Sequence, residues 1–367
     1  MRHSVIGTAI LQKVRYISEY LWTYCEKCDV EVRMQKGERS IAYEIPVYFE
    51  GEGSVVGKKE GEGPLGSLFD EVVEDPMFGE NSWEEAESEL QIRAAKTALK
   101  KSGLERTQIR YLFAGDLEAQ GVASSFGMSE LEIPYFGVFG ACSTMGETLI
   151  LGSSMVAAGQ AEYVLCVTSS HFASAEKEFR FPLEYGNQRP LSAGWTVTGG
   201  GACVLGRRKK PLGITAVTPG KIVDYGMKDS FNMGACMAPA AVDTIEAHFR
   251  DMERKPDDYD AIFTGDLGVT GSRILIEQLA KKGYAIEKMH DDCGLRMYDI
   301  KKQDAHAGGS GCGCAASVLT AYILPRMKEE GWKRILFVPT GALLSKVSFA
   351  QGRTIPAVAH AVCIEAV

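Results

Sequence analysis

The chain has 367 residues, of which 45% are apolar and 24% are charged, enough for more than one core of an α/β protein. Its net charge of −8 argues against nucleic-acid binding, which needs a basic face, although it allows a local basic pocket. No apolar run reaches the ~18 residues of a membrane-spanning helix, and no secretory signal is seen. We therefore expect reduced cysteines and an intracellular protein.

The first 40 residues differ in character from the rest. Residues 10–22 are apolar and basic with helical spacing, which is typical of a helix lying on a surface or membrane. They can also be an appendage outside the fold, because Met34 offers a second start just before the first strand-like run at 43–49; we favour this interpretation. The Cys25 and Cys28 pair lacks the partner pair of a zinc ribbon.

The first half is predicted to alternate helices and strands after a glycine- and charge-rich loop at 50–63. A capping box opens a helix at Ser82, and basic residues with a glycine close it at Gly103. Residues 133–138 read as a buried strand. The apolar residues of 163–167 are consecutive, which indicates a strand covered on both faces.

The second half begins near Gly213 and repeats this alternation. Strands are predicted at 214–217, 261–263, 335–338 and 357–364, and helices at 238–252, 272–282 and 315–327. This order predicts βα units with helices on both faces of the sheet. Between the halves, residues 169–198 have weak periodicity, and loops this long are usually functional.

Two internal repeats relate the halves. Residues 111–117 return as 261–267, each copy following a helix and a polar turn and each ending in Gly-Asp-Leu. A second sequence similarity relates residues 164–169 to residues 335–340. Two similar halves, joined near Gly206, predict a pseudo-twofold arrangement with a pocket where the halves meet.

Cys142 is the first candidate functional residue. It lies at a predicted strand-to-helix turn among small residues, where the positive end of the helix dipole favours a thiolate and a substrate has room to approach. The alternative is a buried structural cysteine, which is the commoner case.

A glycine-rich loop at 304–314 is the second candidate, because glycines allow close backbone approach and helix-start amides attract anions. It matches no phosphate-loop or dinucleotide-binding signature. Gly309 and Cys312 are its candidate ligand contacts. His306 could act as a base, although a lone histidine is more often structural.

Polar residues past strand ends complete the set, because α/β proteins place ligands there. Ser169, Ser170 and His171 follow one strand. Asp116 and Asp266 follow the two repeated strands, and either could bind a ligand or cap a turn.

These features resemble the thiolase and ketoacyl synthase superfamily, and within it most closely the stage V sporulation protein AD family. The resemblance runs from about residue 40 to the C-terminus. The shared segments are 63–66, 114–117, 139–144, 168–171, 238–241, 256–260, 291–295, 307–312 and 340–345.

The resemblance implies a thiolase-like α/β fold in which two duplicated βα halves, 41–206 and 207–367, form α-β-α-β-α layers, with residues 1–40 as an extension. It also implies a protein that binds dipicolinic acid (pyridine-2,6-dicarboxylate) and helps its uptake into the developing spore. The expected partners are other stage V sporulation A membrane proteins, at the forespore or spore inner membrane, and a second copy in a homodimer. No enzymatic activity is established for the family.

Acyl-transfer chemistry by Cys142 remains the alternative. Condensing enzymes pair the cysteine with His/His or His/Asn, whereas the corresponding positions here are Asp266 and Cys312. Neither replaces an oxyanion donor, and each lost donor costs ~3 kcal/mol of transition-state stabilisation. His306 falls where thiolases carry a histidine, which keeps acyl chemistry open.

No cofactor is expected, except that calcium could accompany a ligand with two carboxylates. A pocket containing Asp116 and Asp266 would repel such a dianion unless helix-start amides, a cation such as Arg180, or Ca²⁺ compensated. We therefore hypothesise that Asp116 lies in the pocket and that binding needs Ca²⁺ or a protonated aspartate.

Overall fold

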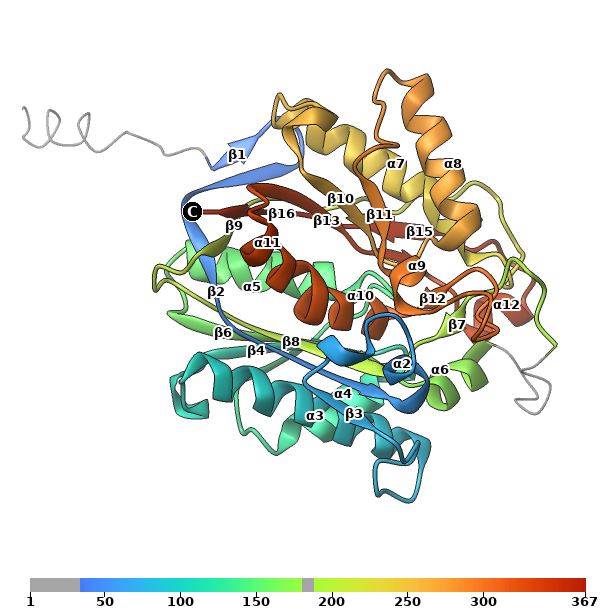
Figure 1. Cartoon of the computed structure of the whole chain (residues 1–367), viewed down its shortest axis with the longest axis horizontal. Helices are drawn as coiled ribbons and strands as arrows, with labels where there is room; N and C mark the ends of the chain where they lie inside the picture. The colour runs from blue at the N-terminus through green and yellow to red at the C-terminus, as the bar shows by residue number, and fades with distance from the viewer. Residues whose placement is uncertain (1–33, 180–187) are drawn as a thin grey trace, which may run out of the picture. The chain divides into compact units, whose positions relative to one another are not determined.

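The computed structural model describes residues 34–179 and 188–367 (Figure 1). The chain divides into two compact units, Met1–Met34 and Gln35–Val367. The predicted helix at 10–22, the Cys25 and Cys28 pair and Arg180 lie outside the described residues.

A single large sheet organises this unit. Across it run β11 (His290–Asp292), β10 (Ala261–Thr264), β13 (Arg334–Val338), β16 (Ala361–Ala366), β9 (Leu212–Thr218), β2 (Ser40–Gly57), β8 (Gly199–Gly206), β6 (Tyr163–Ser170), β4 (Tyr111–Gly115) and β5 (Tyr135–Gly137). Two short strands, β1 (Gln35–Lys36) and β3 (Glu71–Val73), pair with β2.

The strand order carries the internal repeat. Outward from the antiparallel β2–β9 pair, each side of the sheet continues with two antiparallel pairings and then with two parallel pairings. The repeated strands β4 and β10 therefore occupy equivalent positions. Asp116 and Asp266, which follow them, lie at equivalent strand ends.

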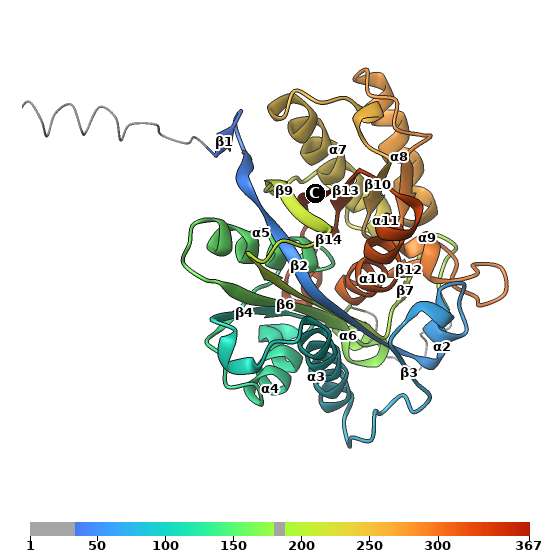
Figure 2. The same ribbon diagram turned by 60° about the vertical axis from the view of Figure 1, so that its left-hand side comes forward.

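The helices form three layers, and one half of the sheet lies between each outer layer and the central one (Figures 1 and 2). α3 (Trp83–Ser102) and α4 (Val122–Ser129) cover the outer face of one half of the sheet. α7 (Met233–Asp251) and α8 (Gly268–Lys281) cover the outer face of the other half. Between them lie α5 (Thr144–Ala157), α10 (Cys312–Val318) and α11 (Leu324–Glu330). The architecture is thus the predicted α-β-α-β-α arrangement.

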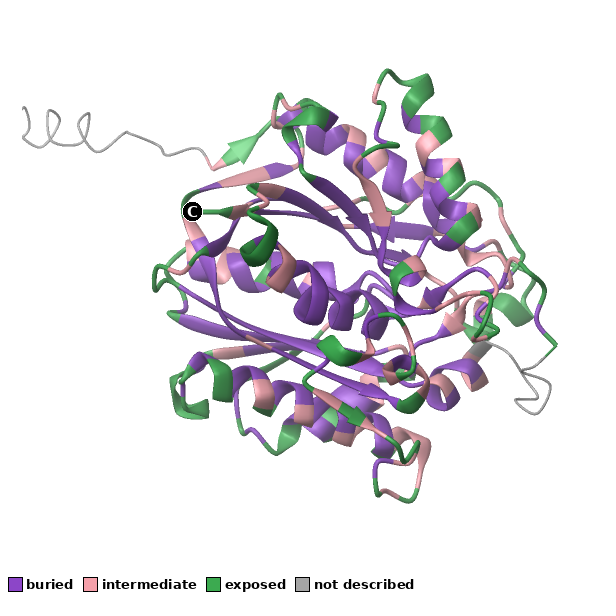
Figure 3. Ribbon diagram, in the orientation of Figure 1, coloured by how far each residue is buried: buried purple, intermediate pink, exposed green. Residues whose placement is uncertain are grey.

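The core lies against both outer helix layers (Figure 3). One apolar cluster packs under α3 and includes Leu90, Leu112 and Leu165, and a second packs under α7 and includes Phe249 and Ile262. Every residue of β6 and β8 is buried, because helices cover both faces of these strands. The consecutive apolar residues at 163–167 predicted this correctly.

Shorter elements connect the layers at the end of the sheet that carries the candidate site. They are α2 (Lys58–Gly61), η1 (Gly66–Leu68), α6 (Phe172–Phe179), β7 (Trp195–Thr196), α9 (Cys293–Met297), β12 (Gly309–Ser310), β14 (Thr340–Ala342), α12 (Lys346–Ala350) and β15 (Ala357–Ala359). β7 and β12 pair with each other in parallel.

Three predicted elements differ in the structure. The glycine-rich stretch after residue 50 is not a loop but the continuation of β2, because α3 packs so closely that a Cβ at Gly53 would lie 2.4 Å from the Ala94 carbonyl oxygen. β5 is an exposed edge strand rather than a buried one. The predicted helix at 315–327 begins at Cys312 and contains a π-helical turn, Leu319–Ile323. By contrast, Ser82 caps α3 and Gly103 closes it with φ +68°, as predicted.

Candidate functional site

Cys142 lies in the turn before α5, next to Ala141, whose φ of +51° places a non-glycine residue in the left-handed region. Such backbone costs ~1–3 kcal/mol and is concentrated at functional sites. The thiol is buried and contacts the carboxylate of Asp266. Burial, followed by this carboxylate, raises the pKa of Cys142 well above its ordinary value. Burial first, and then the carboxylate from the second half, therefore oppose the thiolate that the helix start was expected to favour.

Asp266 is a firmly held hydrogen-bond acceptor. Ser310 Oγ and Gly311 N each donate to one carboxylate oxygen at 2.9 Å, and Thr340 Oγ1 donates to the other at 3.0 Å. Burial raises the pKa of Asp266, while these bonds oppose the shift. An ionised carboxylate in this position cannot donate to an oxyanion.

Cys312 is the first residue of α10 and lies near Cys142 and Asp266, and these three residues form the Cys142 centre. Its thiol donates to the carbonyl of Ser169 at 2.9 Å, and burial raises its pKa well above the ordinary value. Gly309 and Ser310 form β12 beside it and, with Asp266, line a crevice of about 10 Å³. That volume holds about one water molecule and no aromatic ring.

A second buried centre contains three carboxylates, Glu87 of α3, Asp116 and Glu118. Glu87 accepts hydrogen bonds from Ser169 Oγ at 2.9 Å and Ser174 Oγ at 2.5 Å. Burial and the neighbouring carboxylates raise the pKa of Glu87 well above its ordinary value and that of Glu118 to about 7. Burial and the neighbouring charges therefore favour the protonated form of these carboxyl groups, and the centre is unfavourable for a further anion.

Asp116 caps a turn within this centre. It accepts from the backbone N–H of Glu118 at 2.8 Å and from the N–H and hydroxyl of Ser124 at 2.8 and 2.6 Å. Ser124 belongs to α4, so these bonds fix the entry to that helix. Three donors already occupy the carboxylate that we expected to face the ligand.

His171 lines a cavity of about 310 Å³ immediately after β6. Its Nε2 lies 2.8 Å from the Pro76 carbonyl oxygen, and its ring centroid lies 5.4 Å from that of Trp83. The cavity is lined by Gly57, Lys58, Lys59, Glu60, Glu62, Glu74, Pro76, Trp83, His171, Phe172, Ala173, Trp195 and Thr198. Of the residues expected from the sequence to bind a ligand, His171 alone is among them.

Aromatic rings line this cavity together with two lysines, Lys58 and Lys59, and three glutamates, Glu60, Glu62 and Glu74. Phe172 and Trp195 stack with centroids 4.2 Å apart, and Lys59 Nζ lies 3.7 Å from the centroid of the Trp195 ring. Burial, then the nearby Arg189 guanidinium, lowers the pKa of Lys59. Buried Glu60 accepts hydrogen bonds from Tyr298 and from the Thr198 N–H. The cavity thus offers flat apolar walls with an ammonium group over one of them.

The remaining predicted residues lie apart from the cavity. Ser170 Oγ donates to the Val197 carbonyl at 2.7 Å, which joins β6 to the segment before β8. His306 lies 3.0 Å from the Pro190 carbonyl oxygen through Nδ1 and 2.9 Å from Asp304 through Nε2. Both ring nitrogens are thereby occupied, and no contact with Cys142 is found among the described residues.

Sequence reasoning missed Glu87, Glu118, Lys59 and Trp195. A signal existed for Glu87, which lies three residues before Leu90 on the apolar face of α3, an unusual place for a carboxylate. No comparable signal existed for the lysine and the tryptophan, which are far apart in the chain.

Comparison with known proteins decides the family. The family model described as stage V sporulation protein AD matches residues 37–365. The chain belongs to the stage V sporulation protein AD family. Stage V sporulation protein AD of Bacillus subtilis (strain 168) is 44% identical over 329 residues, covering 90% of this chain and 97% of that protein. This is therefore a sporulation protein of stage V.

Solved structures establish the thiolase-like fold. Human mitochondrial 3-ketoacyl-CoA thiolase aligns with a TM-score of 0.58 at 12% identity over 89% of this chain and 99% of that one. 3-Oxoacyl-[acyl-carrier-protein] synthase III of Aquifex aeolicus VF5 aligns with a TM-score of 0.55 at 14% identity, covering 87% and 99%. At such identities the likeness concerns the fold and carries no activity.

Two further observations concern residues 34–179 and 188–367. None of their helices combines the length and apolarity required to cross a bilayer. Nor do three or more His, Cys, Asp or Glu side chains of these residues converge on a position suited to a metal ion.

Proposed function

We propose that this protein binds dipicolinic acid and assists its uptake into the developing spore, as a peripheral protein of the forespore or spore inner membrane acting with other stage V sporulation A membrane proteins. The observation that carries the proposal is the cavity at His171, with its stacked Phe172 and Trp195 and the Lys59 ammonium. Family membership supports the sporulation role.

The chemistry of the cavity suits this ligand. Dipicolinate is a flat aromatic ring with two carboxylates, so it needs planar apolar walls and a cation. Stacked rings supply the first and Lys59 the second. A volume of about 310 Å³ is at the lower end of small-molecule sites, which suits a single ring.

The centre at Cys142 is the less suitable place for a dianion. Its thiol has a raised pKa, Asp266 is a buried acceptor, and the crevice there is about 10 Å³. The same features oppose the alternative of acyl transfer, which needs a reactive thiolate and oxyanion donors. Prolonged incubation with acyl-CoA should leave no mass adduct on Cys142.

In this proposal the ligand binds Ca²⁺, and Asp116 does not. The Asp116 carboxylate already accepts three hydrogen bonds, which a metal ion would have to displace. The two ligand carboxylates can instead bind Ca²⁺, which prefers oxygen donors.

We also propose a homodimer through the exposed edge of β5, where Tyr135 and Phe136 are 40% and 43% exposed.

Titration of the full chain with dipicolinate, with and without calcium, tests the proposal. Lys59→Met should weaken binding about tenfold or more, the effect of ~1.4 kcal/mol or greater. Lys281→Met is the matched control, because that lysine lies on α8 outside the cavity lining and is exposed and paired with Glu277 at 2.6 Å. No measurable binding by the unmodified chain, or equal affinity of both variants, would refute the proposed site.

A further inference from the structure

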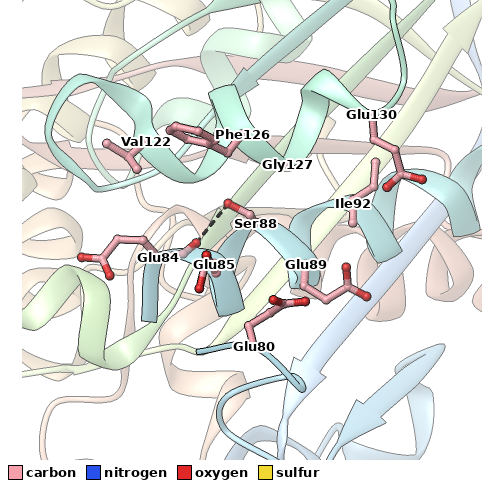
Figure 4. A pocket seen from close by; sticks show the side chains of 10 residues that line it. All are labelled: Glu80, Glu84, Glu85, Ser88, Glu89, Ile92, Val122, Phe126, Gly127 and Glu130. Atoms are coloured by element: carbon pink, nitrogen blue, oxygen red, sulfur yellow. Dashed lines mark hydrogen bonds between the residues drawn. The ribbon is translucent and has the colours of Figure 1, made fainter. Parts of the chain in front are cut away.

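An acid-rimmed groove lies between α3 and α4, away from the candidate site (Figure 4). Its volume is about 370 Å³. It is lined by Glu80, Glu84, Glu85, Ser88, Glu89, Ile92, Val122, Phe126, Gly127 and Glu130. We infer that this groove docks a basic amphipathic helix of a partner protein, whose apolar face packs against Phe126 and whose lysines or arginines meet the glutamates.

The helix pair forms the groove because it packs very closely at one point. Ser88 Oγ donates to the Ala123 carbonyl at 3.0 Å, and a Cβ on Gly127 would lie 2.7 Å from the Ser88 carbonyl oxygen. Glycine at this position lets the two backbones touch, so the longer side chains on either side line an open channel. The channel is therefore built into the packing of two firmly joined helices.

The floor of the groove is apolar. Ile92 is buried at its base, whereas Phe126 is 72% exposed at its edge. Burial of a phenylalanine side chain is favourable, so an exposed ring beside an apolar floor is suited to a partner's apolar side chain. Figure 4 shows Val122 and Phe126 on the α4 side and the glutamates of α3 opposite.

The charge of the rim selects a basic partner. Three of its five glutamates are paired within the chain: Glu84 with Lys177, Glu89 with Arg93 at 2.6 Å, and Glu130 with Lys96 at 2.7 Å. The other two, Glu80 and Glu85, form no ion pair with any described residue. They leave a local negative charge at one mouth of the groove, which attracts lysine or arginine and repels an anionic bilayer or an acidic segment.

A designed peptide can test this docking surface. The probe is a fluorescein-labelled leucine/lysine peptide of about 14 residues, ~four turns, with leucines on one helical face. The matching leucine/glutamate peptide is the charge control. Fluorescence anisotropy with the full chain should show saturable binding of the lysine peptide and none of the glutamate peptide.

Variants of the chain test whether the lysine peptide binds in the groove. Phe126→Ser should weaken affinity about tenfold, the effect of an aromatic hot spot. Glu80→Gln with Glu85→Gln should weaken it about tenfold at low salt, whereas the control Glu287→Gln with Glu329→Gln, equal in net charge and distant from the groove, should change it less than about twofold. All four positions face solvent wholly or in part, so folding is expected to persist and circular dichroism checks it.

Three results would overturn the inference. Equal weakening by both double variants would mean general attraction to an acidic protein. Unchanged affinity of Phe126→Ser would mean that the exposed ring at the edge of the groove is not used. Binding to anionic phospholipid vesicles that Phe126→Ser abolishes would assign the groove to a membrane instead.

Discussion

Glu118 gives a stability prediction that can be worked from the structure. Its side chain is 3% exposed, one carboxylate oxygen has no hydrogen-bond partner, and burial with the Asp116 charge raises its pKa from 4.5 to about 7. In the unfolded chain the group ionises at its ordinary pKa. Between these two values the folded state holds a proton that the unfolded state has released.

The sign follows from proton binding. Stability from this group is fully present below about pH 4.5 and is lost as pH rises through about 7, because ionisation is then harder in the folded state. The difference of about 2.5 between the two pKa values, at ~1.4 kcal/mol each, corresponds to about 3 kcal/mol. Glu118→Gln cannot ionise, so it should remove this loss.

Urea unfolding of the full chain at about pH 5 and about pH 8.5 measures the effect. At the lower pH the variant and the parent should be close in stability. At the higher pH the variant should be more stable by up to about 3 kcal/mol. Glu287→Gln, at an exposed position, should show no such dependence. A variant that loses the same stability at both pH values would refute the reasoning, because Glu118 would then matter for its contacts and not for its charge.

Three further predictions concern packing, the turn at Asp116 and assembly. Gly53→Ala should destabilise by ~1–3 kcal/mol in urea unfolding, because its Cβ would lie 2.4 Å from the Ala94 carbonyl oxygen; an unchanged midpoint would contradict the packing of α3 on β2. Asp116→Asn should cost ~1–3 kcal/mol of stability while leaving calcium-dependent dipicolinate affinity unchanged, and a loss of only the calcium-assisted binding would restore Asp116 as a ligand contact. Sedimentation should show a homodimer at micromolar concentration that Phe136→Glu dissociates, and a parent chain that is monomeric there would contradict the proposed β5 interface.

The duplicated fold was predictable because its signals are local and repeated. The Gly-Asp-Leu segments after β4 and β10 mark equivalent strands, and the apolar run of β6 indicates cover on both faces. β5 was misjudged because an apolar edge strand has the same composition as a buried one. The glycines of β2 were misjudged because only the neighbouring helix reveals why they are needed.

The candidate site was predicted less completely, since its chemistry arises from contacts between distant segments. Residue types and turn position identified Cys142, but the pKa of its thiol depends on its burial and on Asp266 from the other half. Likewise, Lys59 and Trp195 form a cavity wall only because α2 and β7 meet in the fold. The local sequence predicts the backbone conformation around a residue, whereas the pKa of its side chain depends on the groups that the tertiary structure places beside it.

The two halves also place matching groups at the centre of the molecule, and the mismatch between them supports a binding role. Cys142 and Cys312 each stand at the start of a central helix, and Asp116 and Asp266 each follow a repeated strand. Cys142 contacts Asp266 of the opposite half, whereas Cys312 donates to the Ser169 carbonyl and Asp116 is occupied by its turn. Both strand ends therefore present an acceptor where an anion or an oxyanion would need a donor. Under the proposed function, the dianionic ligand is therefore expected in the cavity at His171, where the ammonium of Lys59 lies over an aromatic wall.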